Sequence, residues 1–353
     1  MKIVIEANIP YIRGIFEPYA TVEYLAAGDI DARAVADADA LLVRTRTRCD
    51  ASLLDDSRCR FVGTATIGTD HIDLDYCRHR GITVASAPGC NAPAVAQYVL
   101  ATIGQWCAAN GLTHRLLDGR ITLGIVGVGH VGSIIARQAH EMGINVLECD
   151  PPRKRAEGGH FVDFATIAAL SDIITFHTPL TASGRDATMH MADAQAIAQM
   201  SRCRLLINSS RGPVVDNAAL ADALSAGSFD ADIAIDCWEG EPYIDSRLLD
   251  RAFVATPHIA GYSSQGKHRA TDMMVAAVAA HFGLPLEVKP VDMGNDTSPS
   301  LEQVMQSYNP LVDTAAMRQA MAQRYADGSI SHQAAKAFET LRNTYNLRNE
   351  PLQ

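Results

Sequence analysis

The chain has 353 residues, of which 48% are hydrophobic and 20% charged, and its formal net charge at pH 7 is −10. This length and composition predict two or three packed globular domains and exclude a disordered chain. The acidic balance argues against binding to nucleic acid or to a membrane surface, and no apolar run approaches the roughly 18 uninterrupted residues of a membrane helix.

Compartment and metal content follow from the termini and the cysteines. The N-terminal segment enters a strand pattern directly and lacks the apolar core of a signal peptide. The eight cysteines have no C-x-x-C spacing, so we expect buried, reduced thiols, no metal site and a cytoplasmic location.

Short apolar runs alternate with helical patterns in the first part of the chain. Strands are predicted at residues 2–6, 40–43, 61–64 and 83–85, and a largely apolar helix at 92–110 carries the chain into a second lobe. Such alternation is typical of a doubly wound parallel sheet.

The second lobe repeats this organisation. Strands are predicted at 121–126, 145–148, 173–176, 205–208, 233–236 and 253–255, and six strands fit two mononucleotide-binding halves. A helix at 266–282 would then return to the first lobe.

The last part of the chain has a different character. A polar, proline-containing stretch from Pro285 to Pro299 precedes helices predicted at 313–325 and 331–345. Two amphipathic helices are too few to bury a core alone, so we expect them to dock on a partner subunit. The predicted domains are one of residues 1–95 with 262–284, one of residues 96–261, and a C-terminal dimerisation region of residues 285–353.

A glycine motif stands between the strand at 121–126 and the helical pattern that follows. Gly127, Gly129 and Gly132 form G-x-G-x-x-G. In a dinucleotide site the first glycine permits the tight turn, the second lets the backbone approach a pyrophosphate, and the third lets the helix pack on the strand. The exposed N–H groups of the helix would hold the diphosphate.

Asp150 selects between the two nicotinamide cofactors. It lies 18 positions after Gly132, close to the spacing at which a carboxylate binds the adenosine ribose, and its charge would repel a 2′-phosphate. The prediction is NAD. Two alternatives remain: Asp150 caps the turn before Pro151, or the basic run 153–155 accepts a 2′-phosphate.

Three successive predicted strands of the second lobe end in charged or ionisable residues. Arg211 follows the strand at 205–208, an acidic segment with Asp236, Glu239 and Glu241 follows the next, and His258 follows the last. Ligands of open parallel sheets bind at the carboxyl ends of strands, so this convergence indicates a catalytic site. Taken singly, Arg211 would also fit a surface ion pair and His258 a structural histidine.

A basic cluster, Arg44-Thr45-Arg46-Thr47-Arg48, follows the strand at 40–43 in the first lobe. Guanidinium groups and hydroxyls together suit a carboxylate or a phosphate. A solvated strand end is the alternative.

Taken together, these motifs resemble the D-isomer-specific 2-hydroxyacid dehydrogenases. The resemblance covers residues 1–282 and rests on four features: G-x-G-x-x-G with its distant Asp, N-x-x-R-G-x-x-x-D at 208–216, the Glu241-Pro242 pair, and P-H-I-A-G at 257–261. It implies two doubly wound parallel-sheet (Rossmann-like) α/β domains joined by a hinge, with a small helical C-terminal dimerisation region.

The resemblance also assigns roles to individual residues. His258 would be the acid/base, Glu241 would hold its tautomer and favour its protonated form, and Arg211 would bind the substrate carboxylate. Cofactor contacts would come from Gly127, Gly129, His130, Val131, Gly132, Asp150, Thr178, Ser209, Ser210, Asp236 and Gly261. Substrate contacts would come from Arg44, Thr45, Arg46, Thr66 and Tyr262, with Thr45 standing where serine is more common in similar sequences.

The expected activity is NAD-dependent oxidation of a small phosphorylated 2-hydroxy acid of four carbons by a homodimer, with Arg44 and Arg46 near the distal phosphate. The nearest alternative is oxidation of 3-phosphoglycerate, one carbon shorter, or of another D-2-hydroxy acid. An alternative of another class is an NAD-sensing corepressor, which keeps the same Arg, Glu and His.

Overall fold

A computed structural model of the chain describes residues 1–286 and 298–351. It divides into two compact units, one made of Met1–Asn91 with Ser263–Gly294 and the other of Ala92–Tyr262 with Asn295–Gln353. The boundaries after Asn91 and Tyr262 lie four residues and one residue from the predicted ones, whereas the third, after Gly294, lies ten residues beyond the predicted one. The C-terminal helices were predicted as a separate region but belong to the same unit as the glycine motif. Of the polar stretch predicted from Pro285 to Pro299, residues 287–297 lie outside the described residues.

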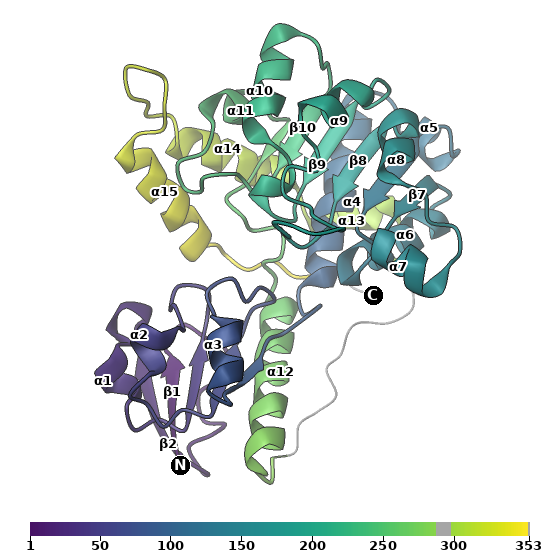
Figure 1. The fold of residues 1–353 in the computed structure, drawn as a ribbon. Helices are drawn as coiled ribbons and strands as arrows, with labels where there is room; N and C mark the ends of the chain where they lie inside the picture. Colours follow the sequence, from purple (N-terminus) through teal and green to yellow (C-terminus); the bar gives the residue numbers. More distant parts are fainter. Residues whose placement is uncertain (287–297, 352–353) are drawn as a thin grey trace. The chain divides into compact units, whose positions relative to one another are not determined.

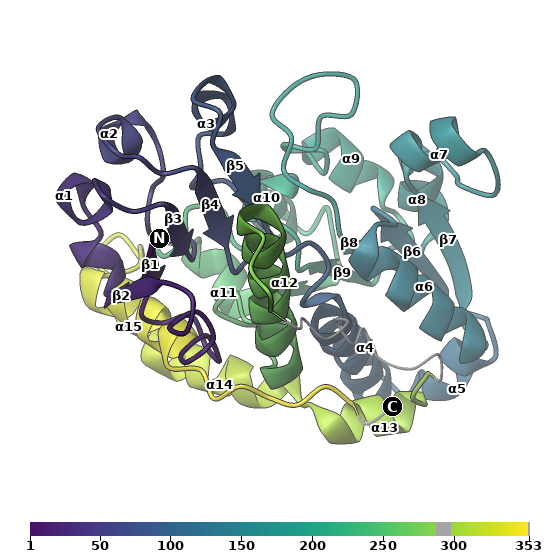
Figure 2. The same cartoon turned by 90° about the horizontal axis from the view of Figure 1, so that it is seen from below.

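The first unit contains a five-stranded parallel sheet in the order β2-β1-β3-β4-β5 (Figure 1 and Figure 2). Its strands are β1 (Lys2–Glu6), β2 (Thr21–Leu25), β3 (Ala40–Val43), β4 (Phe61–Thr64) and β5 (Thr83–Ala85). The prediction missed β2, an edge strand whose residues are only half-buried, because it lacks the continuous hydrophobicity of a central strand.

Alternating residues of this sheet face two apolar clusters. One face packs on α12 (Ser264–Phe282), through residues such as Ile5, Leu42 and Met274. The other face, with Val4 and Leu41, is covered by short helices. These helices are η1 (Ala27–Asp29), α1 (Ala32–Val35), α2 (Ala51–Leu54) and α3 (Leu74–His79).

The second unit contains a six-stranded parallel sheet in the order β11-β10-β9-β8-β6-β7. Its strands are β6 (Thr122–Val126), β7 (Asn145–Cys149), β8 (Ile173–Phe176), β9 (Leu205–Asn208), β10 (Asp232–Ile235) and β11 (Val254–Ala255). The predicted fold class, two doubly wound parallel-sheet domains, is confirmed. All six strands predicted for the second lobe are present. Beyond β7 no further strand lies among the described residues, only the hydrogen bond from Val162 N to Glu148 O.

This strand order places a topological switch point between β6 and β8, where the chain leaves in opposite directions and ligands of open sheets bind. Helices cover both faces of the sheet (Figure 2). They are α4 (Ala92–Ala109), α5 (Thr113–Leu117), α6 (His130–Glu141), α7 (Pro151–Glu157), α8 (Phe164–Leu170), α9 (Ala194–Gln199), η2 (Gly212–Val214), α10 (Asn217–Ala226) and α11 (Ser246–Arg251).

The C-terminal segment forms α13 (Leu301–Ser307), α14 (Pro310–Ala320) and α15 (His332–Asn343). The prediction missed α13 and extended α14 too far. After α14 the chain turns, and Arg324 and Ile330 form an isolated antiparallel β-bridge. The apolar faces expected for a partner subunit are instead buried in the chain's own second unit, where Leu301 joins one cluster and Phe338 the other. The helices therefore complete the core of that unit.

The cysteines match the expectation of buried, reduced thiols. All eight cysteines are buried and free of disulfides. Among the described residues, no helix combines the length and the apolar character needed to cross a bilayer.

Candidate active site

The glycine turn after β6 has the shape that a diphosphate requires. Gly127 adopts a φ of +87°, a backbone conformation that favours glycine. A Cβ at Gly132 would lie 2.1 Å from the carbonyl oxygen of Gly127, whereas a Cβ at Gly129 would meet nothing within 4 Å. The helix α6 begins directly after Gly129 with no side-chain cap, so its first N–H groups, from His130 onward, are available to an anion.

Asp150, at the end of β7, lies beside this turn. Its Oδ2 accepts a hydrogen bond from Val128 N at 2.9 Å, and its Oδ1 accepts one from Arg153 N at 3.0 Å as the N-cap of α7. The capping role considered from the sequence is thus real. A carboxylate has about four lone-pair positions, so these two bonds leave capacity for ribose hydroxyls.

The basic residues after Asp150 are committed to other partners. Arg153 forms a bidentate pair with Glu157, with distances of 2.8 and 2.7 Å. Arg155 pairs with Asp186. Two of the three cations considered for a 2′-phosphate therefore already face carboxylates, which favours NAD over NADP.

Two buried hydroxyls at the carboxyl ends of β8 and β9 have no hydrogen-bond partner among the described residues. They are Thr178 Oγ1 and Ser209 Oγ, whereas the hydroxyl of the neighbouring Ser210 donates to Asn208 Oδ1 at 2.9 Å. Buried polar groups are normally paired, so these two are the groups that a bound ligand would satisfy. Both were predicted cofactor contacts, and with the open glycine turn they form a site that fits NAD.

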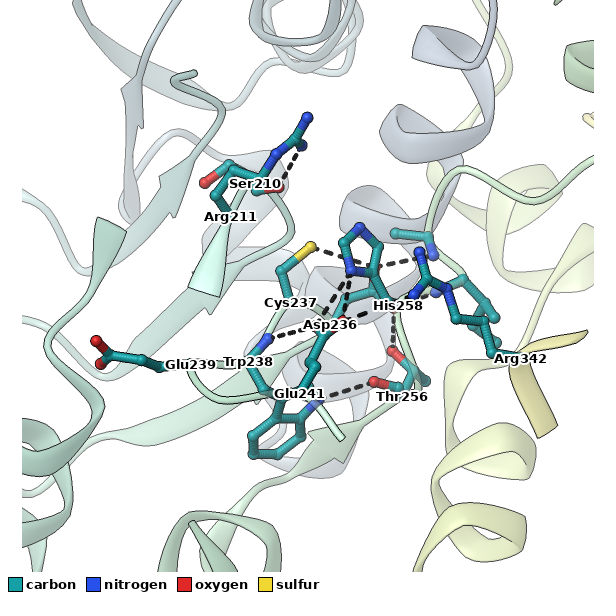
Figure 3. Close-up of polar contacts among 12 residues, drawn as sticks. Ser210, Arg211, Asp236, Cys237, Trp238, Glu239, Glu241, Thr256, His258 and Arg342 are labelled. Atoms are coloured by element: carbon teal, nitrogen blue, oxygen red, sulfur yellow. Dashed lines mark hydrogen bonds and ion pairs between the residues drawn. The ribbon is translucent and has the colours of Figure 1, made fainter. Parts of the chain in front are cut away.

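A hydrogen-bonded acid–histidine pair lies at the carboxyl ends of β10 and β11. The Nδ1 of His258 lies 3.1 Å from Oε1 and 3.0 Å from Oε2 of Glu241 (Figure 3). Trp238 N also donates to Oε1 at 2.8 Å. With Nδ1–H donating to the carboxylate, Nε2 of His258 is left to accept a proton from a ligand.

The charge state of Glu241 reflects these partners. Burial raises the pKa of its carboxyl group, but the charge of His258, the hydrogen bonds from His258 and Trp238, and the charge of Arg342 together outweigh it. The net pKa lies below the ordinary value of 4.5. Glu241 is therefore ionised when it holds the imidazole.

Asp236, predicted as a cofactor contact, supports the loop that carries His258. It is 1% exposed. Its Oδ1 accepts from Ile259 N and Thr256 Oγ1, both at 2.7 Å, and its Oδ2 accepts from Ala260 N at 3.0 Å. The carbonyl oxygen of Asp236 accepts a hydrogen bond from His258 N, and His258 has a backbone φ of +58°. Burial raises the pKa of Asp236, with the charge of His258 and these hydrogen bonds opposing it.

Arg211 follows β9, the strand next to β10. Its Nη1 donates to the carbonyl oxygen of Ser210 at 2.9 Å. Figure 3 shows its guanidinium and the ring of His258 projecting from neighbouring loops toward the same side. Because β9, β10 and β11 are parallel neighbours, Arg211, Glu241 and His258 all lie at one edge of the sheet.

Glu239, the other acid of this segment, faces away from the pair. Its Oε1 lies 2.8 Å from Nε2 of His190, whose Nδ1 lies 3.6 Å from Asp216. These three residues offer ligand atoms within 4.8 Å of one another, but both histidine nitrogens already face a carboxylate. The arrangement is that of an ion-pair network.

The predicted substrate residues Arg44, Thr45, Arg46 and Thr66 belong to the first unit. Arg44 N donates to Oε2 of Glu6 at 2.8 Å, which ties the loop after β3 to the end of β1, its neighbour in the sheet. Thr66 shares a 2.7 Å hydrogen bond with Thr64. Tyr262, the fifth predicted substrate residue, and Gly261 belong to the second unit.

Sequence reasoning missed several supporting residues of the second unit. Thr256 links Asp236 to Tyr98, whose hydroxyl lies 2.8 Å from Thr256 Oγ1. Arg342, on α15, lies 3.9 Å from Oε2 of Glu241. Thr256 was detectable as part of the strand-end segment, whereas Arg342 sits in a helix without any motif.

An open glycine turn with Asp150 beside it, in the same sheet as an Arg, a Glu and a His on three adjacent strand ends, is the arrangement expected of an NAD-dependent dehydrogenase. The family model for the D-isomer specific 2-hydroxyacid dehydrogenase NAD binding domain matches residues 94–260. The chain belongs to this family of NAD-dependent enzymes, and NAD is its cofactor.

Curated relatives match nearly the whole chain. The erythronate-4-phosphate dehydrogenase of Pseudomonas fluorescens (strain SBW25) is 41% identical over 99% of this chain and 93% of its own length. The protein of the same name from Bacteroides thetaiotaomicron is 40% identical over 99% of this chain and 97% of its own.

Solved structures share the fold at lower identity. The D-lactate dehydrogenase of Aquifex aeolicus, complexed with NAD and lactic acid, is 24% identical with a TM-score of 0.63 over 80% of this chain and 95% of that chain. An acyclic imino acid reductase in complex with NADPH is 20% identical with a TM-score of 0.67 over 80% of this chain and 97% of that one.

Proposed function

We propose that the protein oxidises the C2 hydroxyl of 4-phospho-D-erythronate to a ketone, giving 2-oxo-3-hydroxy-4-phosphobutanoate and reducing NAD to NADH. The Glu241–His258 pair beside the loop of Arg211 is the observation that carries this proposal. The substrate follows from relatives that carry the name erythronate-4-phosphate dehydrogenase at about 40% identity over 99% of the chain.

In this reaction His258 is the general base. Its Nε2 accepts the proton of the C2 hydroxyl while the C2–H bond breaks and C2–O becomes a carbonyl. NAD, held at the glycine turn, would supply the acceptor for the hydride that leaves C2. Glu241 holds Nδ1–H, and its negative charge stabilises the imidazolium that forms. In the reverse direction protonated His258 returns the proton to the ketone oxygen.

Arg211 binds the substrate carboxylate. Its planar guanidinium presents two parallel N–H donors, which orient the C2 hydrogen as well as neutralise the acid. The remaining substrate contacts that we propose are Arg44, Thr45, Arg46 and Thr66 of the first unit and Tyr262 of the second, with the arginines near the phosphate.

NAD is held by the residues around the switch point of the second unit. The backbone of the glycine turn would bind the diphosphate and Asp150 the adenosine ribose. The hydroxyls of Thr178 and Ser209, which lack partners, would gain them from the cofactor. We also propose contacts with Ser210, Gly261 and the Asp236 loop near the nicotinamide.

We further propose that the enzyme acts in the cytoplasm as a homodimer, serving pyridoxal phosphate biosynthesis. The first unit would bind substrate, the second NAD, and residues 285–353 would form the dimer contact. This contact would use the surface that the C-terminal helices leave exposed, where Val312 and Tyr325, on and after α14, are 66% and 45% exposed. Sedimentation equilibrium tests this, with a monomer at micromolar concentration as the contrary result.

Initial rates with NAD and a panel of acids test the substrate. The panel contains 4-phospho-D-erythronate, 3-phosphoglycerate, D-glycerate and D-lactate, and NADH absorbance reports turnover. We expect the highest kcat/KM for 4-phospho-D-erythronate. Equal or faster turnover of an acid without phosphate would reject the substrate assignment, and no turnover of any acid would favour an NAD-binding module.

A further inference from the structure

A cation from the C-terminal segment reaches the catalytic pair. Arg342, on α15, places Nη1 3.9 Å from Oε2 of Glu241, whose two oxygens also contact Nδ1 of His258. The Arg342 side chain is 21% exposed and that of Glu241 18%. In Figure 3 Arg342 lies beside the His258 ring, on the side away from Arg211.

The chain segment just after α15 is tied to the loop that carries His258. The guanidinium of Arg348 donates to the carbonyl oxygens of Ile259 and Tyr262 at 3.0 and 3.1 Å, and also to that of Ala260. Its Nη2 donates to Ala94 O at 3.0 Å. These bonds fix α15 against the residues that follow His258, so the approach of Arg342 to Glu241 is built into the second unit.

The other ionisable groups around the pair come from four elements. Asp236 and Cys237 lie at the end of β10, Arg211 after β9, Tyr262 after β11, and Glu339 on α15 beside Arg342. Burial raises the pKa of the Cys237 thiol well above its ordinary value, so it stays neutral. Burial lowers the pKa of Arg342, but the interactions with Tyr262 and Glu241 raise it by more, so the net pKa lies above its ordinary value. The guanidinium is therefore positively charged at every pH at which the enzyme is assayed.

We propose that Arg342 is a positioning residue of the catalytic pair: it keeps Glu241 ionised and holds His258 in the neutral, proton-accepting form down to lower pH. The proposal rests on the proposed function in so far as His258 is the base of the oxidation. Arg342 acts through Glu241 and is assigned no contact with the substrate.

The physical reason is the sign of the added charge. A carboxylate alone favours imidazolium, which is the wrong form for accepting the hydroxyl proton. A second cation on the same carboxylate competes with the imidazolium and opposes protonation of both His258 and Glu241. The pair then keeps its geometry while the base remains available at a lower pH.

The curated relatives named for erythronate 4-phosphate match 99% of this chain, which includes α15. The solved structures match about four-fifths of it and nearly all of their own length, so a fifth of this chain lies outside the part that each of them shares.

The pH dependence of kcat/KM tests the proposal, measured with whichever 2-hydroxy acid the enzyme oxidises best. In Arg342→Gln the acid limb of the pH profile should move up by about 0.5–1 pH unit, because the substitution removes a partly exposed positive charge that lies 3.9 Å from Oε2 of Glu241. Arg342→Lys keeps the positive charge, so the acid limb should stay close to its wild-type pH. Arg324→Gln, which breaks an exposed C-terminal ion pair with Asp250, is the matched control and should leave the profile unchanged.

A second readout needs no turnover. The protein is labelled at Cε1 of histidine, and the titration of the His258 signal is followed by NMR, assigned with His258→Gln. The midpoint should rise in Arg342→Gln by the same amount as the acid limb. If Arg342→Gln does not give a native near-UV circular dichroism spectrum, Arg342→Met, which keeps the apolar stem, replaces it.

Two results would overturn the proposal. One is an unmoved acid limb and midpoint in Arg342→Gln with a raised KM, which would make Arg342 a substrate ligand or a packing residue. The other is an equal displacement in the Lys and Gln variants. An enzyme that oxidises none of the acids would refute the proposed function, while the NMR midpoint would still decide the role of Arg342.

Discussion

Replacing Glu241 with Gln should lower kcat/KM by about one to two orders of magnitude. The carboxylate accepts from His258 Nδ1 through both oxygens, at 3.1 and 3.0 Å, and from Trp238 N at 2.8 Å. A glutamine side chain has a single oxygen to accept from both His258 Nδ1 and Trp238 N. Its NH2 group would face one of these donors without bonding to it, and the side chain carries no charge. A hydrogen bond to a charged group contributes about 1.5–3 kcal/mol, which corresponds to about 10- to 150-fold in rate.

Steady-state NADH formation measures this effect, and a fluorescence titration checks that the Kd for NAD is unchanged. The matched control is Glu239→Gln, which removes a carboxylate two positions away that pairs with His190 instead. The control should retain nearly full kcat/KM. Wild-type kcat/KM in Glu241→Gln, or an equal loss in Glu239→Gln, would refute the reasoning.

Three further predictions concern Arg211, Asp150 and His177. Arg211→Lys keeps the charge but loses the two-pronged geometry, so kcat/KM for the acid should fall by about 10-fold or more at unchanged NAD affinity; unchanged steady-state kinetics would exclude carboxylate binding. Asp150→Ala should weaken NAD binding and narrow the preference over NADP, as calorimetric titration of both cofactors would reveal, and an intact preference would contradict it. Burial lowers the pKa of His177 from 6.5 to about 3. Between these pH values the imidazole is neutral in the folded protein but protonated in the unfolded chain. The free energy of unfolding therefore falls as the pH drops toward 3, by up to about 1.4 kcal/mol per pH unit. In His177→Asn, urea unfolding between pH 7 and 4 should show a shallower loss, and an identical slope would contradict this account.

The sheets were predictable because the described strands all pair in parallel and most of them are central. Buried strands such as β3 and β9 appear as continuous apolar runs, and their alternation with helices defines the fold class. The edge strand β2 is half-exposed and carries no such signal. Two of the three C-terminal helices were predicted with approximate bounds, but their packing partner was not, because an apolar helix face does not specify whether its own chain or a partner covers it.

The chemistry of the site was predictable at strand ends, where parallel topology brings Arg211, Glu241 and His258 to one edge. Asp236 illustrates the limit of that reasoning. The sequence places it at the same edge, but the structure commits both of its oxygens to the backbone and hydroxyl groups of the neighbouring loop. Arg342 could not be predicted, since its approach to Glu241 depends on how α15 folds back onto the sheet and leaves no local pattern.

A single-turnover measurement of NAD reduction in His258→Ala tests the central claim most directly, namely that His258 takes the hydroxyl proton as hydride leaves. With saturating NAD and 4-phospho-D-erythronate, we predict a rate lower by about 10²–10⁴-fold and an NAD affinity equal to that of the wild type. A His258→Ala enzyme that reduces NAD at nearly the wild-type rate would contradict the account.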